Sequence, residues 1–204
     1  MNEKGYLQNA NLAGSACYGH TNLVPAFCRA YYKESGTPLV VVHVAKGSTR
    51  IEYWSPGNEG YQILLDKASA AIRKAKELYE VRNIYFVWLQ GERDAISSKS
   101  REYYKEKLYL LGESLKTELE ISRFGIIRVG RFTGDSRDDE ILQAQDEICS
   151  ENPFFLMLTR IATTLNQDPM MMNPYVKGHY SALGLETLGK SAGETLGKNN
   201  KING

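Results

Sequence analysis

Four apolar runs of strand length, separated by segments long enough for helices, constrain the fold of this chain more than any other feature. The runs cover residues 38–44, 83–89, 124–130 and 154–159. Their β-branched and aromatic side chains are typical of strands that are buried on both faces. Strands joined by helices form right-handed βαβ units and a parallel sheet. The sequence therefore predicts an α/β fold, a three-layer sandwich in which helices cover both faces of a flavodoxin-like parallel sheet.

Helices are predicted where apolar residues recur at helical spacing. The segments are residues 24–34, 60–80, 97–120, 135–149 and 181–196. Pro25 suits the first turn of the first helix, and Gly36 is expected to end it. The acidic run at 135–140 is expected to be a solvated helix start, which suits the helix dipole.

The same spacing predicts which helical side chains face inward. In the second helix these are Ile63, Ala70 and Leu78. In the third they are Tyr104, Leu108, Leu111, Leu115 and Leu119. In the last they are Leu185, Leu188 and Leu196.

The composition fits one ordinary globular domain over residues 1–204, with a loop-like segment at 1–23 and a tail at 198–204. A net charge of +1 gives no electrostatic attraction to nucleic acid. No apolar run approaches the roughly 20 residues of a membrane span, so neither nucleic acid nor a membrane is expected as a partner. The N-terminus lacks the apolar core of a signal peptide, so we expect a cytoplasmic protein.

The cysteines give no sign of a metal site. Cys17, Cys28 and Cys149 form no C-x-x-C pair. The sequence therefore predicts neither a disulfide framework nor a bound metal.

Polar residues follow the second apolar run at the predicted carboxyl end of its strand. Gln90 offers an amide donor, and Glu92 and Asp94 offer carboxylates. Functional sites of parallel α/β sheets lie at this edge. The alternative is that both carboxylates are solvated loop charges paired with Arg93 and Arg50.

Two glycines and a histidine complete the candidate site. Gly47 follows the first apolar run, where its N–H could meet a developing oxyanion, although a plain βα turn would need the same residue. Gly91 allows a tight turn after Gln90. His179 precedes the last helix, where a short loop would hold a general base. Taken alone, it could equally be a satisfied surface or core histidine.

Taken in order, four blocks between residues 19 and 196 resemble the SGNH-hydrolase superfamily, and within it the sialate O-acetylesterase and acetylxylan esterase group of carbohydrate esterases. The blocks are GHTNLVPAFCRAYY, HVAKGSTRIEYW, WLQGERDA and GHYSALGLETLG. They are similar to the family's GPELSFARAL, VAxGGTSIxxW, WHQGExD and DGxHYxxxGYxxLG blocks.

The resemblance implies the reaction and the role of each candidate residue. The reaction is removal of O-acetyl groups from a sugar or polysaccharide by Ser-His-acid acyl transfer, with an acetylated carbohydrate as partner and no metal or organic cofactor. We expect the Glu92 and His179 side chains within hydrogen-bonding reach, directly or through water. The implied roles are the base for His179, the orienting acid for Glu92, the oxyanion hole for Gly47, Gln90 and Gly91, and loop support for Asp94.

This sequence departs from the family's pattern at three places. No nucleophile block of the type GQSN occurs in residues 1–23, where GSAC offers only Ser15. Leu89 stands where the family often has histidine, and Val176 where it usually has aspartate. We therefore expect an impaired esterase. The alternatives are a non-catalytic carbohydrate-binding domain of the same fold and an unrelated nucleotide or phosphate binder, which would need a glycine-rich phosphate loop that is missing here.

The same departure bears on the sheet. In flavodoxin-like order the first strand is central, between the strands at 38–44 and 83–89. Without it, those two could pair directly, residues 1–15 could fill the slot, or another chain could supply a strand. We expect direct pairing, together with low stability or self-association as a homo-oligomer in solution.

Overall fold

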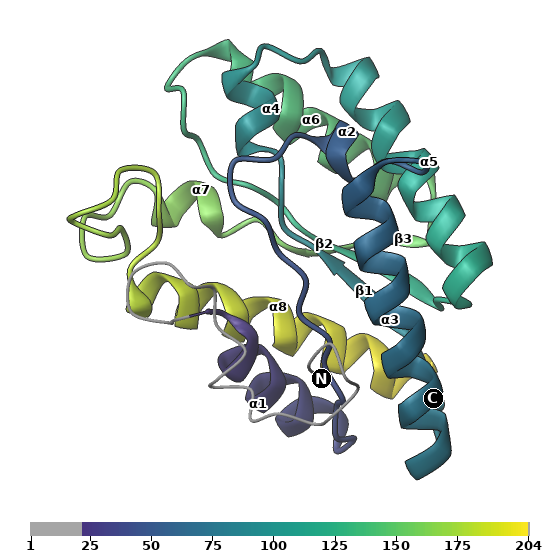
Figure 1. Ribbon diagram of the computed structural model, residues 1–204. Helices are drawn as coiled ribbons and strands as arrows, with labels where there is room; N and C mark the ends of the chain where they lie inside the picture. Colours follow the sequence, from purple (N-terminus) through teal and green to yellow (C-terminus); the bar gives the residue numbers. More distant parts are fainter. Residues whose placement is uncertain (1–21, 204) are drawn as a thin grey trace.

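The computed structural model describes residues 22–203 and has a parallel sheet with helices on both faces (Figure 1). Its three strands are β1 (Tyr85–Trp88), β2 (Arg123–Ile127) and β3 (Phe155–Thr159), paired in the order β1-β2-β3. Both pairings are parallel. The predicted α/β class is therefore confirmed.

Two hydrophobic cores, one on each face of the sheet, make the three layers. The helices are α1 (Val24–Ser35), α2 (Ile51–Trp54), α3 (Glu59–Leu78), α4 (Glu92–Ile96), α5 (Arg101–Leu119), α6 (Ser136–Glu151), α7 (Ala162–Leu165) and α8 (Ala182–Asn203). One core joins α2, α3, α5 and α6 to Trp88, Phe124 and Ile126. The other joins α1, α7 and α8 to Ile127 and Leu158. Figure 1 shows α1 and α8 together below the sheet.

Helix α5 follows its sequence pattern closely. Ser100 caps its first turn by accepting a hydrogen bond from Tyr103 N, as expected of an N-cap serine. All five side chains predicted to face inward are buried: Tyr104, Leu108, Leu111, Leu115 and Leu119. The first four are fully buried. This helix forms the centre of the first core.

Glycines allow α1 and α8 to pack with their backbones in contact. Gly189 and Gly193 of α8 lie against the carbonyl groups of Leu23 and Phe27, so that a Cβ on either glycine would clash with a carbonyl oxygen. Gly197 lies in the same way against the Tyr31 carbonyl. Close approach of this kind brings many atoms of both helices into van der Waals contact.

The strand predicted at residues 38–44 is not present in the structure. The segment is partly exposed, and it pairs with none of the three strands. Val40 is 42% exposed, whereas a strand buried on both faces was predicted. The predicted direct pairing with the strand at 83–89 is also wrong. Apolar composition alone therefore did not place this segment beside β1, β2 or β3.

Two helices differ from their predictions. Ile63 and Leu78 of α3 are exposed, because α3 packs against α2 and α5 through Tyr61 and Leu64 instead. Helix α8 continues to Asn203, beyond the predicted end at Leu196. Asn200 fixes this extra length, since its side-chain oxygen accepts hydrogen bonds from the Tyr85 hydroxyl at 2.5 Å and from Asn83 at 3.2 Å.

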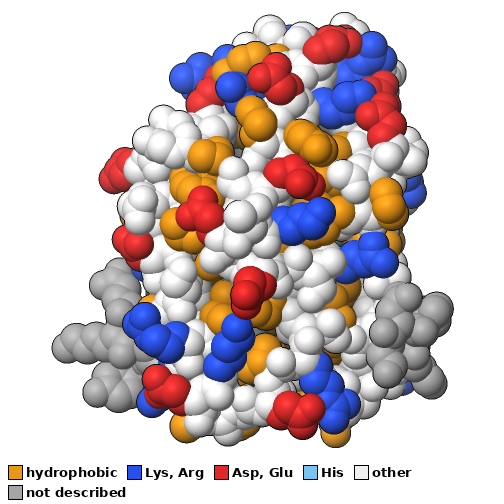
Figure 2. Space-filling model, turned by 90° about the vertical axis from the view of Figure 1, so that its right-hand side faces the viewer, with side chains coloured by type: hydrophobic (Ala, Val, Ile, Leu, Met, Phe, Trp, Pro, Cys, Tyr) orange, Lys and Arg blue, Asp and Glu red, His pale blue; other side chains and the backbone are white. Residues whose placement is uncertain are grey.

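The predictions for residues 1–21, including Ser15 and most of the loop at 1–23, lie outside the described residues. In the described part of the chain, every helix is too short or too polar to cross a bilayer. Figure 2 shows one face of the molecule, on which acidic and basic side chains are interspersed among hydrophobic ones. No patch of a single sign dominates that face.

Substituting Gly193→Ala tests the α1–α8 contact. Alanine in a helix interior ordinarily stabilises by about 1 kcal/mol relative to glycine. Here the added methyl group would meet the Phe27 carbonyl, and overpacking of this kind costs about 1–3 kcal/mol. We expect a lower free energy of unfolding in urea denaturation.

Gly47→Ala is the matched control, because a Cβ at Gly47 meets no atom within 4 Å. Its free energy of unfolding should stay close to that of the wild type. A Gly193→Ala protein that is as stable as the wild type, or more so, would show that the two helices are not held at backbone contact.

Candidate functional site

The carboxyl end of β1 is tied to the loop that precedes α2. The Gln90 Nε2 group donates hydrogen bonds to Asp94 Oδ2 at 2.6 Å and to the Thr49 carbonyl at 2.9 Å. The Asp94 carboxylate also accepts from Ile51 N at 3.1 and 3.2 Å. Asp94 is fully buried. This carboxylate therefore holds the first turn of α2 against the start of α4.

The Gln90 side chain is consequently not free. A primary amide has two N–H groups, and those of Gln90 are directed at Asp94 and Thr49. Gln90 is also only 8% exposed. Contrary to the expectation from the sequence, its side chain has no N–H left for an oxyanion in this structure.

The Gln90 backbone carbonyl is held by a second, fully buried network. It accepts hydrogen bonds from the Tyr104 hydroxyl at 2.7 Å and from Gln145 Nε2 at 2.9 Å. Gln145 Oε1 accepts from Val129 N at 3.0 Å, and Trp88 Nε1 donates to the Tyr104 hydroxyl at 3.2 Å. Gln145 thus joins the ends of β1 and β2, a role that its helical position did not reveal in the sequence.

Burial shifts both carboxylates of this edge towards the neutral form. It raises the pKa of Asp94 to about 6, although hydrogen bonds from the Gln90 side chain and the Ile51 backbone lower it in part. Burial also raises the pKa of Glu92. The backbones of Glu92 and Gly91 partly offset that rise, and the charge of Asp94 adds to it. Raised pKa values at the end of a strand are typical of functional sites.

Asp138 anchors the loop after β2. Its carboxylate accepts hydrogen bonds from the backbone N–H groups of Phe132, Thr133 and Gly134 at 2.9–3.1 Å. It is 2% exposed, so the acidic run is not simply a solvated helix start. Asp135 is the N-cap of α6 and accepts from Arg137 N.

His179 lies on a short hairpin between α7 and α8. The hairpin is closed by hydrogen bonds from Asn173 N to the His179 carbonyl and from Ser181 N to the Met171 carbonyl, each 2.8 Å long. The His179 side chain is exposed. Among residues 22–203 its imidazole makes no hydrogen bond or ion pair, so the structure does not join it directly to Glu92. A contact through water stays a prediction.

Tyr180 relates this hairpin to the end of β1. Its ring packs edge-on against Phe132, and its buried hydroxyl has no hydrogen-bond partner among the described residues. Burial raises the pKa of Tyr180, and the charge of Glu92 raises it further. Phe132 lies in the loop after the carboxyl end of β2, and Glu92 follows the carboxyl end of β1, so the His179 hairpin and Glu92 lie at the same edge of the sheet.

Gly47 lies in an exposed turn beside this edge. Open space surrounds it, and Thr49, two residues later, contacts Gln90. The next residue, Ser48, has a positive φ of 59°, which is uncommon outside glycine. The structure thus brings Gln90, Gly91, Glu92 and Asp94 together around the end of β1, and the Thr49 contact ties the turn that contains Gly47 to Gln90.

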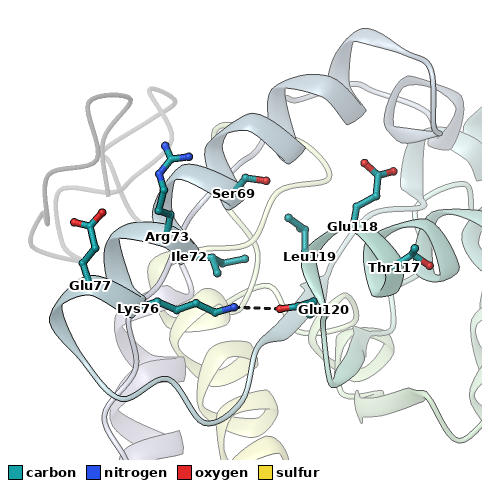
Figure 3. A pocket seen from close by; sticks show the side chains of 9 residues that line it. All are labelled: Ser69, Ile72, Arg73, Lys76, Glu77, Thr117, Glu118, Leu119 and Glu120. Carbon is teal, nitrogen blue, oxygen red and sulfur yellow. Dashed lines mark hydrogen bonds and ion pairs between the residues drawn. The ribbon is translucent and has the colours of Figure 1, made fainter.

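A surface groove between α3 and α5 lies elsewhere (Figure 3). The ion pair between Lys76 and Glu120, 3.1 Å long, crosses it. Both helices end here, just before β1 and β2 begin. The groove is therefore at the amino ends of the strands, opposite the candidate site.

The described residues contain no group of three or more histidine, cysteine or acidic side chains arranged to hold a metal ion.

Comparison with known proteins identifies the family of this chain. Residues 18–196 match the family described as "Carbohydrate esterase, sialic acid-specific acetylesterase". A protein of Arabidopsis thaliana named as a probable carbohydrate esterase is 26% identical over 123 residues, which are 59% of this chain and 45% of that relative. The match thus spans less than half of the relative's length.

The buried Asp94 predicts a pH dependence of stability. Its pKa in the folded protein, about 6, lies above its ordinary value of 3.8, so the folded protein binds this proton more tightly than the unfolded chain. The free energy of unfolding should therefore rise as the pH falls from 7 through 6 towards about 4. Since one pKa unit corresponds to about 1.4 kcal/mol, the Asp94 contribution is about 1–3 kcal/mol.

Urea denaturation at several pH values checks this in the wild type and in Asp94→Asn. The free energy of unfolding of the wild type, relative to that of Asp94→Asn, should rise as the pH falls from 7 towards about 4. Asp66→Asn, at an exposed position of α3, is the control and should follow the wild-type curve. Parallel curves for Asp94→Asn and the wild type would contradict the shifted pKa.

Proposed function

This chain belongs to the sialic acid-specific acetylesterase family of carbohydrate esterases, and we propose that it removes an O-acetyl group from a sugar or polysaccharide. The observation that carries the proposal is the family match over residues 18–196, which includes the end of β1 and the His179 hairpin. Fold alone would not identify an activity, because one α/β architecture supports many kinds of chemistry.

The proposed reaction is acyl transfer through a nucleophile, a base and an orienting acid. His179 takes the proton from the nucleophile, and Glu92 stabilises the imidazolium that forms. Backbone N–H groups at Gly47 and Gly91 would stabilise the oxyanion. Two features support these roles: the exposed His179 side chain is accessible to a ligand, and Glu92 begins α4 shortly after β1, at the carboxyl edge of the sheet.

The nucleophile is the least supported part. The family's GQSN block has no counterpart in the sequence, and Ser15 lies outside the described residues. We therefore propose that hydrolysis by this polypeptide is impaired.

A second candidate function is carbohydrate binding without hydrolysis. The missing nucleophile block favours it, and so does the Gln90 side chain, whose two N–H groups are already engaged. A protein of this kind would bind an acetylated sugar at the same edge and leave the ester intact.

Hydrolysis of p-nitrophenyl acetate, assayed beside calorimetric binding of an O-acetylated sialic acid, separates the two functions. We expect slow turnover, because loss of a triad nucleophile costs on the order of 10⁶ in kcat. Since the residues of a triad act as a unit, His179→Ala should lower this slow rate little further. Lys177→Ala, two residues earlier in the same hairpin, controls for disturbance of the loop and should keep the wild-type rate.

Fast hydrolysis that depends on His179 would contradict the proposed impairment and reveal a nucleophile, for which Ser15→Ala is the first test. Sugar binding without any turnover would favour the binding domain. The absence of both binding and turnover would overturn both functions for this polypeptide.

A further inference from the structure

The peptide between Gln90 and Gly91 is the most tightly oriented polar group at the candidate site. Its carbonyl accepts two hydrogen bonds, from the Tyr104 hydroxyl and from Gln145 Nε2. Both donors are fully buried, and each has a further partner, Trp88 for Tyr104 and Val129 for Gln145. Four side-chain and backbone groups therefore fix one carbonyl direction.

A fixed carbonyl also fixes the N–H of the same peptide. The peptide group is planar and trans, so the Gly91 N–H points opposite to the Gln90 carbonyl. The carbonyl points to α5 and α6, so the N–H points away from those helices. The Gly91 N–H faces the Glu92 carboxylate, and a hydrogen bond from the Gly91 backbone lowers the pKa of Glu92 in part.

The packing around Gly91 holds this arrangement in place. Its φ of 150° is a conformation that side chains rarely allow. A Cβ at this position would lie 2.7 Å from Ile141 Cγ2 and 3.3 Å from the Tyr104 hydroxyl. The turn after β1 can therefore approach Tyr104 and Gln145 this closely only because residue 91 is glycine.

We propose that Tyr104 and Gln145 are positioning residues, which turn the Gly91 N–H towards the ligand side of the site and make it, rather than the Gln90 side chain, the hydrogen-bond donor for an acyl oxygen. This inference rests on the proposed function for the identity of the ligand. Neither residue touches the ligand, since both act through the Gln90 carbonyl. The Glu92 carboxylate lies on the same side and competes for this donor.

The sequence allows Gly91 to be observed alone. Gln90–Gly91 is the only Gln–Gly pair in the chain, so labelling glutamine carbonyls with ¹³C and glycine nitrogens with ¹⁵N selects one amide signal by NMR. Sodium acetate, the product of the proposed deacetylation, is the probe, and sodium chloride at equal ionic strength is the control. We expect acetate, and not chloride, to move the Gly91 signal to saturation.

Tyr104→Phe and Gln145→Leu remove the hydrogen bonds and nearly preserve side-chain volume. In both variants we expect the Gly91 signal to move without ligand and the acetate response to fall several-fold. Tyr61→Phe is the matched control, because it also removes the hydroxyl of a buried tyrosine, which is bonded at 2.6 Å to Glu118 in the groove at the amino ends of the strands. It should lose stability and keep the acetate response. Glu92→Gln removes the competing charge and should strengthen that response.

Two results would overturn the inference: a wild-type Gly91 signal that acetate does not move, or acetate responses in Tyr104→Phe and Gln145→Leu equal to that of Tyr61→Phe. Kinetics add a second readout wherever p-nitrophenyl acetate is hydrolysed. There both variants should lower kcat, by up to about 10²–10³, at a nearly unchanged KM. Absence of turnover would count against the proposed function alone, since the NMR result does not depend on it.

Discussion

Where β1 leaves the sheet, its backbone polar groups need new hydrogen-bond partners. The candidate site depends on the partners that the Gln90 carbonyl finds there. A buried carbonyl without a partner is costly, and that of Gln90 finds two partners on different helices, Tyr104 and Gln145. Gln145 also binds Val129 N at the end of β2. The network thereby links two strands and two helices, and it fixes the direction of the peptide between Gln90 and Gly91.

Around this network, buried acids attach the loops. Asp94 holds the start of α2 through Ile51 N, and Asp138 holds the loop at 132–134. A carboxylate can accept several N–H bonds at once, which makes it effective at fixing irregular backbone. Burial of Asp94 raises its pKa, so the same contact that orders the site is sensitive to pH. The His179 hairpin differs, since it is held by its own backbone bonds, by side-chain bonds of Asn173 and Ser181, and by the Tyr180 ring contact with Phe132.

On the opposite face of the sheet, the packing depends on close contact between helix backbones rather than on hydrogen bonds between polar side chains. Glycines at every fourth position of α8 let α1 approach to backbone contact, and this pair covers Ile127 and Leu158. The two faces therefore have different parts in the protein. Helices α5 and α6 supply the groups that orient the site, while α1 and α8 close the second core beneath it.

The sequence by itself determined the α/β class, the three strands that pair, the buried stripe of α5 and the family, because each depends on local apolar spacing or on ordered blocks such as WLQGERDA. Only the tertiary structure decided what depends on partners distant in the chain. Residues 38–44 have strand composition, yet they pair with none of the strands β1, β2 and β3. The Gln90 side chain resembles a free donor in the sequence but is engaged by Thr49, 41 residues away, and its carbonyl by Gln145, 55 residues away. Hydrogen bonds over such separations leave no periodic signal in a sequence, so they can be identified only in the tertiary structure.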